Sequence, residues 1–397
     1  MNASEAAQRL KDATWLRTPE TQKLFAFLDG AGGRTRAVGG IVRDTLLGQV
    51  RGNTEIDFAT ELVPDEVMRR AVEAGVPVYP TGIEHGTVTL RIGELVAEVT
   101  TLRQDVETDG RHAIVKFGTD WRRDAERRDF TLNALYAGAD GTLFDPLDGV
   151  ADCLVGVVRF IGDADQRIAE DRLRVYRFFR FSASHGREML DAEGLAAVTR
   201  AAGTLGELSG ERVGREMRRM LELGKIGRTM EAMTAAGIVE FPPTLVERLH
   251  GYERHARRPN LNARLALLVE SLGSVGLKER WRLSNDDIAT AEAILSAARL
   301  LIAFHVNEAA YRYPAALADG TEVAATIAGW TESGKSTVMQ HLDSIEVPRF
   351  PIDGNDLIEK GFKPGPKLGA ELDRLERKWI ASNFRLDRGA LLADLTS

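Results

Sequence analysis

The chain has 397 residues, 44% of them hydrophobic, which is enough for roughly two to four domains with real cores. Its formal net charge of −7 argues against a uniformly basic nucleic-acid-binding protein, although a single basic face would still suffice to bind RNA. The lone Cys153 excludes an intrachain disulfide, no apolar run approaches the roughly 20 residues that span a bilayer, and the N-terminus lacks the pattern of a signal peptide, so we expect a cytoplasmic protein without a membrane partner.

The first 148 residues mix helical and strand patterns, which predicts an α/β fold for this part of the chain. The expected elements, in chain order, are helical spacing within 3–30, a short strand in RAVGG (36–40), a helix over 41–47 that ends at Gly48, a strand in EIDFAT (55–60), a helix over 64–75 and a hairpin over 85–102 that turns at Gly93.

From Asp163 onward the pattern becomes almost wholly helical. Helices are expected at 163–184, 191–203, 209–223, 227–236, 243–257, 261–272, 286–303 and 354–382. An α/β head followed by an all-α remainder favours a catalytic part in front and a scaffold behind it.

The stretch GGIVRDTLLGQVRGNTEID (39–57) contains the most informative chemistry. Gly39 and Gly40 allow a backbone to approach a phosphate closely, and Arg43 can fork onto phosphate oxygens. Glu55 and Asp57 alternate with apolar residues, so on a strand both carboxylates point to one face. A divalent cation would relieve their mutual repulsion, which predicts a metal site beside a triphosphate site. The alternative is two solvated carboxylates on a strand face.

Two further segments offer candidate groups. Glu98 falls on the strand face of Val96 and Thr100, where it would supply a third metal oxygen or remain an isolated surface carboxylate. In RRDFTLNAL (127–135), Arg128 can clamp a phosphate and Asn133 can bond a sugar hydroxyl, although an RRD triplet is also common where helices begin.

The segment EDRLRVYRFFRF (170–181) places four charged residues at intervals of three, namely Asp171, Arg174, Arg177 and Arg180. On one helix these side chains would form a slowly drifting stripe. Such a stripe can be a solvated basic face. It can also read a base, because a carboxylate accepts from an exocyclic amine and a guanidinium donates to ring or carbonyl acceptors.

Two motifs have simpler interpretations. GWTESGKS (329–336) matches the phosphate loop of P-loop proteins letter for letter, but an Ala-rich, helical pattern precedes it where a buried strand is needed. We therefore expect Lys335 to be an ordinary surface lysine in a helix–helix connection. Ser209 in LSGERVGREM (208–217) has the features of a helix N-cap.

Several of these segments together resemble one family. The chain resembles the class II tRNA nucleotidyltransferases, which comprise bacterial CCA-adding enzymes and their poly(A) polymerase relatives. The resemblance rests on eight motifs in the family's order, which are VGGIVRDTLLG, EIDFAT, TGIEHGTVTL, EVTTLR, TDGRHAIVKF, RRDFTLNAL, EDRLRVYRFFRF and LSGERVGREM. It extends more loosely to the C-terminus through FPIDGNDLIEKGFKPGPKLG (350–369).

The resemblance implies a nucleotidyltransferase head over 1–148, a neck over 149–208 that reads the incoming base, a body over 209–305 and a tail over 306–397 that binds tRNA. It implies that Glu55 and Asp57 are catalytic and bind Mg²⁺, and that Glu98 is a further acidic residue of the catalytic site. The implied nucleotide contacts are Gly39, Gly40, Arg43, Asp44, Arg128, Asp129, Asn133, Asp171, Arg174, Arg177 and Arg180. Residues 103–116 correspond to the family's mobile loop for addition of the final A.

The family pattern is usually Asp-x-Asp, and here its first member is Glu55. The longer arm of glutamate requires the metal or the backbone to shift if an octahedral shell is kept. The implied function is template-independent addition of CCA to tRNAs that lack all or part of it, from CTP and ATP by two-metal nucleotidyl transfer, with no obligate protein partner. The alternatives are a poly(A) polymerase, a CC- or A-adding enzyme, and an RNA-binding protein with an inactive head.

Overall fold

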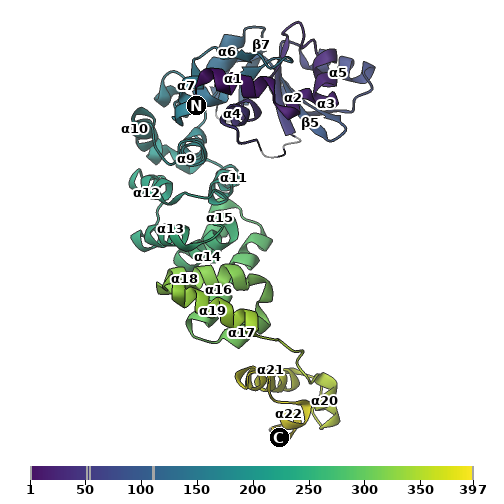
Figure 1. Cartoon of the computed structure of the whole chain (residues 1–397), viewed down its shortest axis with the longest axis vertical. Coiled ribbons are helices and arrows are strands. Elements are labelled where there is room, and N and C mark those ends of the chain that lie inside the picture. Colours follow the sequence, from purple (N-terminus) through teal and green to yellow (C-terminus); the bar gives the residue numbers. More distant parts are fainter. Residues whose placement is uncertain (1, 51, 53–54, 110–111, 396–397) are drawn as a thin grey trace. The chain divides into compact units, whose positions relative to one another are not determined.

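The computed structural model describes residues 2–50, 52, 55–109 and 112–395. The chain divides into two compact units, the first formed by Met1–Glu216 with Arg228–Glu240 and the second by Met217–Gly227 with Phe241–Ser397. In Figure 1 the first unit combines a sheet with helices, whereas the described part of the second is helical. Within the described ranges, no helix is long and apolar enough to cross a membrane. The finer boundaries after 148, 208 and 305 stay predictions.

The helical spacing predicted within 3–30 is confirmed as three short helices, α1 (Ala3–Lys11), α2 (Thr14–Arg17) and α3 (Pro19–Phe27). Asn2 begins α1 with a reciprocal capping box that it forms with Glu5. Trp15 of α2 donates its indole N–H to Thr45 at 2.8 Å, which ties this helical entry to the helix that follows the first strand.

In the described part of the chain, the main sheet has seven strands in the order β3-β4-β5-β2-β1-β8-β9. Strands β2 and β5 pair in parallel and the other neighbours are antiparallel, so the sheet is mixed as predicted. The predicted strand 55–60 and the hairpin that turns at Gly93 are confirmed, whereas β3, β8 and β9 were not predicted. The strands are β1 (Thr35–Val38), β2 (Glu55–Thr60), β3 (Val78–Gly82), β4 (Thr87–Ile92), β5 (Leu95–Thr101), β8 (Tyr136–Ala137) and β9 (Leu143–Phe144).

Helices pack beside this sheet and around its C-terminal strands. The helix predicted over 41–47 is α4, which ends at Gly48 in the left-handed conformation, and the helix predicted over 64–75 is α5. Trp121 and Tyr136 form the aromatic centre of one core cluster, with their rings 5.5 Å apart and edge to face. These helices are α4 (Gly40–Leu47), α5 (Pro64–Glu73), α6 (Trp121–Glu126), α7 (Gly149–Val155), and the 3-10 helices η1 (Ile83–His85) and η2 (Thr131–Asn133).

The segment expected to be a mobile loop, 103–116, contains two strands. β6 (Arg103–Asp109) and β7 (His112–Phe117) pair antiparallel as a ribbon of their own. The β-branched and aromatic residues within RQDVETD and HAIVKF favour strands. Residues 110 and 111 lie outside the described residues.

The single helix predicted over 163–184 is wrong, because two helices occupy this range. α8 (Ala164–Glu170) ends at Asp171, whose backbone is extended with φ −150° and ψ 101°, and α9 (Arg174–Ser184) begins three residues later. Next come α10 (Ala192–Ala201), the 3-10 helix η3 (Ala202–Glu207), α11 (Gly210–Leu221) and α12 (Gly227–Ala235). Ser209 caps α11 as predicted, because its hydroxyl accepts the backbone N–H of Arg212 at 3.4 Å.

The second unit stacks helices, and the predicted helix over 354–382 is divided here too. Its two parts, α20 and α21, are separated around Gly361 and Gly365, which have φ of 96° and 147°. The C-terminal helices share a hydrophobic core cluster, in which Trp379 is buried. The helices are α13 (Pro243–His255), α14 (Leu261–Leu272), α15 (Ser274–Trp281), α16 (Asn285–Ile302), α17 (Val306–Arg312), η4 (Pro314–Ala316), α18 (Leu317–Ala328), α19 (Glu332–Ser344), α20 (Gly354–Glu359), α21 (Pro366–Ala381) and α22 (Arg388–Ala393).

Candidate active site

The predicted acidic face exists on β2 and β5. Along β2, Glu55 and Asp57 are exposed and Ile56 and Phe58 are buried, as the alternation predicts. The parallel register places Glu98 of β5 opposite Asp57. Partial burial and the neighbouring charges of Glu98 and Glu55 raise the pKa of Asp57, and the positive charge of Arg128 opposes them.

The donor chemistry of this face suits a hard divalent cation. Carboxylate oxygens are the ligands that Mg²⁺ prefers, and a cation would relieve the repulsion that raises the pKa of Asp57. Glu55 and Asp57 are therefore the residues that fit a metal. Within the described ranges, no three His, Cys, Asp or Glu side chains lie together closely enough to hold a metal ion, so the geometry offers no support for Glu98 as a third ligand.

The glycine turn before α4 has the geometry of a phosphate cradle. Gly39 has φ 74° and ψ −122°, a conformation that a side chain would strain, and a Cβ there would lie 3.6 Å from the carbonyl oxygen of Asn133. Its N–H donates to the carbonyl of Leu135 at 3.0 Å. A Cβ on Gly40 would lie 3.7 Å from Nη2 of Arg43, so the absent side chain leaves room beside this guanidinium.

Arg43 is only 6% exposed and is held on two edges. Its Nε donates to Oδ1 of Asp44 at 2.8 Å, and its Nη1 donates to Oδ1 of Asn133 at 2.6 Å. Nδ2 of Asn133 donates in turn to Asp129 at 3.1 Å. Both the oxygen and the nitrogen of the Asn133 amide thus form hydrogen bonds within the protein. The sequence predicted that Asn133 would bond a sugar hydroxyl, but in the structure this buried side chain orients Arg43.

Arg128 is fixed by a carboxylate that the sequence analysis did not single out. Asp124 of α6 is 1% exposed, and its Oδ2 accepts from Nη2 of Arg128 at 3.1 Å and from the Tyr136 hydroxyl at 3.0 Å. Its Oδ1 accepts from Arg127 at 2.6 Å. Burial alone would raise the pKa of Asp124, but the two guanidinium groups hold it below its ordinary value. The spacing Asp124–Arg127–Arg128 on a helical turn was the available signal.

Two of the predicted base-reading arginines form ion pairs on α9. Arg177 donates from Nε to Asp129 at 2.7 Å, and Arg180 donates from Nε to Glu216 of α11 at 2.5 Å. Glu216 is 3% exposed and also lies 3.9 Å from Arg177. The predicted helical stripe is therefore confirmed only for the arginines. Glu216 was missed, although it follows Arg212 by one helical turn.

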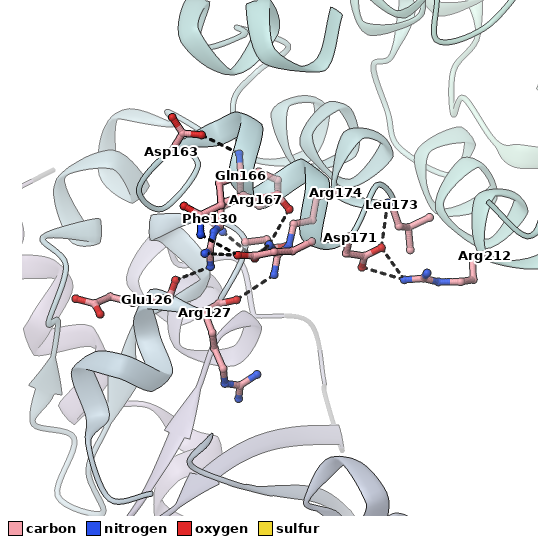
Figure 2. A network of polar contacts seen from close by, with 12 residues as sticks. Glu126, Arg127, Phe130, Asp163, Gln166, Arg167, Asp171, Leu173, Arg174 and Arg212 are labelled. Atoms are coloured by element: carbon pink, nitrogen blue, oxygen red, sulfur yellow. Dashed lines mark hydrogen bonds and ion pairs between the residues drawn. The ribbon is translucent and has the colours of Figure 1, made fainter. Parts of the chain in front are cut away.

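Asp171 and Arg174 lie on the two sides of the break between α8 and α9, as Figure 2 shows. Nη2 of Arg212 donates to both carboxylate oxygens of Asp171, at 3.0 and 2.9 Å. Nη1 of Arg174 donates to Glu170 at 2.7 Å, and its Nη2 donates to the carbonyl of Arg127 at 3.0 Å. The two side chains are thus oriented by residues from three other segments.

The GWTESGKS segment joins two helices, as predicted. Gly329 ends α18 in the left-handed conformation, and Thr331 caps α19. The prediction of a surface lysine is wrong, because Lys335 is 3% exposed. Its ammonium group donates to the carbonyl of His255 at 2.7 Å and to Glu322 at 3.1 Å, so it serves as a buried connection between α13, α18 and α19.

Comparison with known proteins decides the family. A model of the poly A polymerase head domain matches residues 35–159. The mitochondrial CCA tRNA nucleotidyltransferase 1 of Danio rerio is 33% identical over 96% of this chain and 93% of its own length. The chain belongs to the CCA tRNA nucleotidyltransferase family. The CCA-adding enzyme of Levilactobacillus brevis is 30% identical over 93% of this chain and 95% of its own length. The resemblance read from the eight motifs is confirmed, and with it the nucleotidyltransferase class.

Solved structures of this family have the same fold. The Bacillus stearothermophilus CCA-adding enzyme in complex with CTP superposes with a TM-score of 0.75 at 26% identity, over 95% of this chain and 96% of the other. The Thermotoga maritima CCA-adding enzyme complexed with tRNA has a TM-score of 0.67 at 19% identity, over 97% of each chain. The predicted α/β head with a helical remainder is therefore confirmed.

Proposed function

We propose that this chain adds CCA to the 3′ ends of tRNA from CTP and ATP without a nucleic-acid template, acting in the cytoplasm. Relatives that align with nearly the whole chain are named for CCA addition, and similar solved structures are complexes with CTP, ATP or tRNA. The observation that carries the proposal is the pair Glu55 and Asp57 on the exposed face of β2, influenced by the charge of Arg128.

In this proposal Glu55 and Asp57 would hold Mg²⁺, which would supply activation of the RNA 3′-hydroxyl and charge compensation for the leaving pyrophosphate. Arg128 and Arg43 bind the triphosphate with guanidinium forks, because Asp124 and Asn133 fix their planes. The turn at Gly39 lets backbone groups approach the phosphates. The protein thus acts mainly by positioning and by charge compensation, as in phosphoryl transfer generally.

Base selection is proposed at the break between α8 and α9. Asp171 accepts hydrogen bonds and Arg174 donates them, which is the pairing needed to distinguish the edges of C and A from those of U and G. Arg177 and Arg180 stand further along α9 and are paired with Asp129 and Glu216. We assign them to the wall of the nucleotide site and leave the direct reading of the base to the first two.

Radiolabel incorporation tests the proposal. The chain is given Mg²⁺ and three tRNA substrates, ending before CCA, after C and after CC, with CTP alone, ATP alone and both. We expect CMP addition to the first two, AMP addition only after CC, and an end at the complete CCA. Long A tails would indicate a poly(A) polymerase, and addition of only C or only A would indicate a partial enzyme. Binding of tRNA without any addition would indicate an RNA-binding protein with an inactive head.

A further inference from the structure

His185 makes a contact between two helices that the proposed chemistry does not use. It follows α9 as its C-cap, and its side chain is 12% exposed. Its Nε2 lies 3.2 Å from Oδ1 of Asp44 on α4, and its Nδ1 lies 2.6 Å from the hydroxyl of Ser184. The histidine therefore connects the end of the neck helix with the helix that follows the glycine turn.

The carboxylate that receives this contact also holds a proposed triphosphate ligand. The same Oδ1 of Asp44 accepts Nε of Arg43 at 2.8 Å. Arg43 thus has a guanidinium edge fixed by Asp44, which His185 in turn restrains, and a second edge fixed by Asn133. A shift of the Asp44 carboxylate would rotate the guanidinium fork, whose plane decides which phosphate oxygens it can meet.

The hydrogen-bond roles of His185 and Ser184 follow from Asp44, which accepts hydrogen bonds from both His185 and Arg43. Burial would raise the pKa of Asp44, but hydrogen bonds from His185 and Arg43 and the charge of Arg43 hold it low, so Asp44 only accepts. Nε2 of His185 must then carry the proton. Burial lowers the pKa of His185 against the pull of Asp44, which favours the neutral ring, so Nδ1 accepts from Ser184.

A second, independent observation concerns the backbone after His185, which is held in an unfavourable conformation. Arg187 and Glu188 are consecutive non-glycine residues with φ of 52° and 59°. Such strain persists only where surrounding contacts over-determine the backbone. The Glu188 carboxylate accepts the N–H of Thr229 at 2.9 Å, and a Cβ on Gly156 would lie 2.9 Å from the carbonyl oxygen of His185. The backbone that follows His185 is thus held by contacts on two sides.

We propose that His185 is a positioning residue for the triphosphate, which it orients through Asp44 and Arg43. This inference rests on the proposed function. Because a triphosphate is common to CTP and ATP, His185 affects the binding of both nucleotides equally and plays no part in base choice. It also ties the position of α9, which bears the proposed wall of the nucleotide site, to that of the phosphate ligand on α4.

The test compares two substitutions that separate hydrogen bonding from packing. His185→Phe keeps a ring against Phe181, whose ring centre lies 5.7 Å away, but cannot donate to Asp44. His185→Gln loses the ring but keeps a donor. With the full-length chain, Mg²⁺ and tRNA lacking CCA, we expect His185→Phe to raise KM for CTP and ATP alike by about tenfold with kcat changed less than about twofold. His185→Gln should restore KM to within about threefold of the wild type.

A double-substitution cycle checks that the effect passes through Arg43. In an Arg43→Lys background, which lacks the fork, His185→Phe should raise KM by less than about twofold. A full tenfold effect in that background, an unchanged KM in the single variant, or a shift in the CTP-to-ATP preference would each overturn the inference. Val155→Ala, an exposed position at the end of α7, serves as the folding control. A wild-type chain that adds no nucleotide would instead refute the proposed function.

Discussion

Asp57 of β2 and Glu98 of β5 lie opposite each other in a parallel register, so two carboxylates share one patch of the sheet. Partial burial and this neighbour raise the pKa of Asp57 above its ordinary value of 3.8. The folded chain then binds more protons than the unfolded chain between the two pKa values, so stability falls as pH rises through that window. At neutral pH the ionised Asp57 therefore lowers the stability of the fold. This destabilisation is retained for function, because a bound cation requires the negative charge of the carboxylate.

Asp57→Asn should therefore abolish nucleotide addition without harming the fold. We expect a Tm equal to that of the wild type or up to about 2 °C higher in the absence of Mg²⁺. Mg²⁺ should raise the Tm of the wild type and leave that of the variant unchanged, because a ligand that binds only the native state stabilises it. Calorimetry with and without Mg²⁺ measures both effects. An equal Mg²⁺ response in the two proteins would refute the metal role.

Arg212→Ala should change base choice more than phosphate binding. Arg212 donates to both oxygens of Asp171, and its loss frees the carboxylate to rotate away from the base edge. We expect the preference for CTP and ATP over UTP and GTP, measured as kcat/KM for each nucleotide, to fall by about tenfold or more. Arg172→Ala, which breaks the exposed pair with Glu207, is the control. Equal discrimination in the wild type and Arg212→Ala would count against Asp171 as a base reader.

Asp124→Asn should destabilise the first unit, because it removes the buried charged carboxylate that accepts hydrogen bonds from both Arg127 and Arg128. Breaking a buried ion pair in this way costs about 3–5 kcal/mol of unfolding free energy. The pKa of Asp124 is below its ordinary value of 3.8, so its contribution is fully present above that pH and disappears as the pH falls further. Urea unfolding at pH 7, 5 and 3 should show a large loss at pH 7 that shrinks at pH 3.

The exposed pair of Asp165 and Arg200 supplies a matched control for this experiment, because both side chains are more than half exposed. Asp165→Asn should leave the urea midpoint of unfolding unchanged at each of these pH values, because an exposed ion pair contributes little to stability. If the two variants were equally stable at pH 7, Asp124 would be no more than a surface-type partner of Arg128.

Local patterns in the sequence predicted the parts of the site that lie on regular elements. The alternation in EIDFAT predicted the shared face of Glu55 and Asp57, because a strand has a period of two whatever it packs against. The role of Gly39 could also be predicted from local sequence, because the turn itself requires a backbone conformation that favours glycine. The register that places Asp57 opposite Glu98 depends on the strand order, which brings together residues about 40 positions apart along the chain.

Distant contacts decided what the sequence analysis got wrong. Nothing local in EDRL ends a helix, and the break at Asp171 is held by Arg212, 41 residues further on. The polar residues around Lys335 are typical of an exposed segment. Its ammonium group nevertheless donates to the carbonyl of His255, 80 residues earlier in the chain. Asp124 and Glu216 were overlooked because a buried carboxylate shows its role only once its partners are in place.

Lys335→Ala should weaken the second unit and leave nucleotide transfer intact. The ammonium group is buried with Glu322 at 3.1 Å, so its removal strands a largely buried carboxylate and should cost about 2–4 kcal/mol of unfolding free energy. Ser336, the next letter of the phosphate-loop motif, is exposed, and Ser336→Ala should change neither stability nor activity. Below the melting temperature, kcat and KM for ATP should match the wild type in both variants. Loss of ATP use in both would instead restore GWTESGKS as a working phosphate loop, in which the lysine and the serine hydroxyl act together on the phosphates and Mg²⁺.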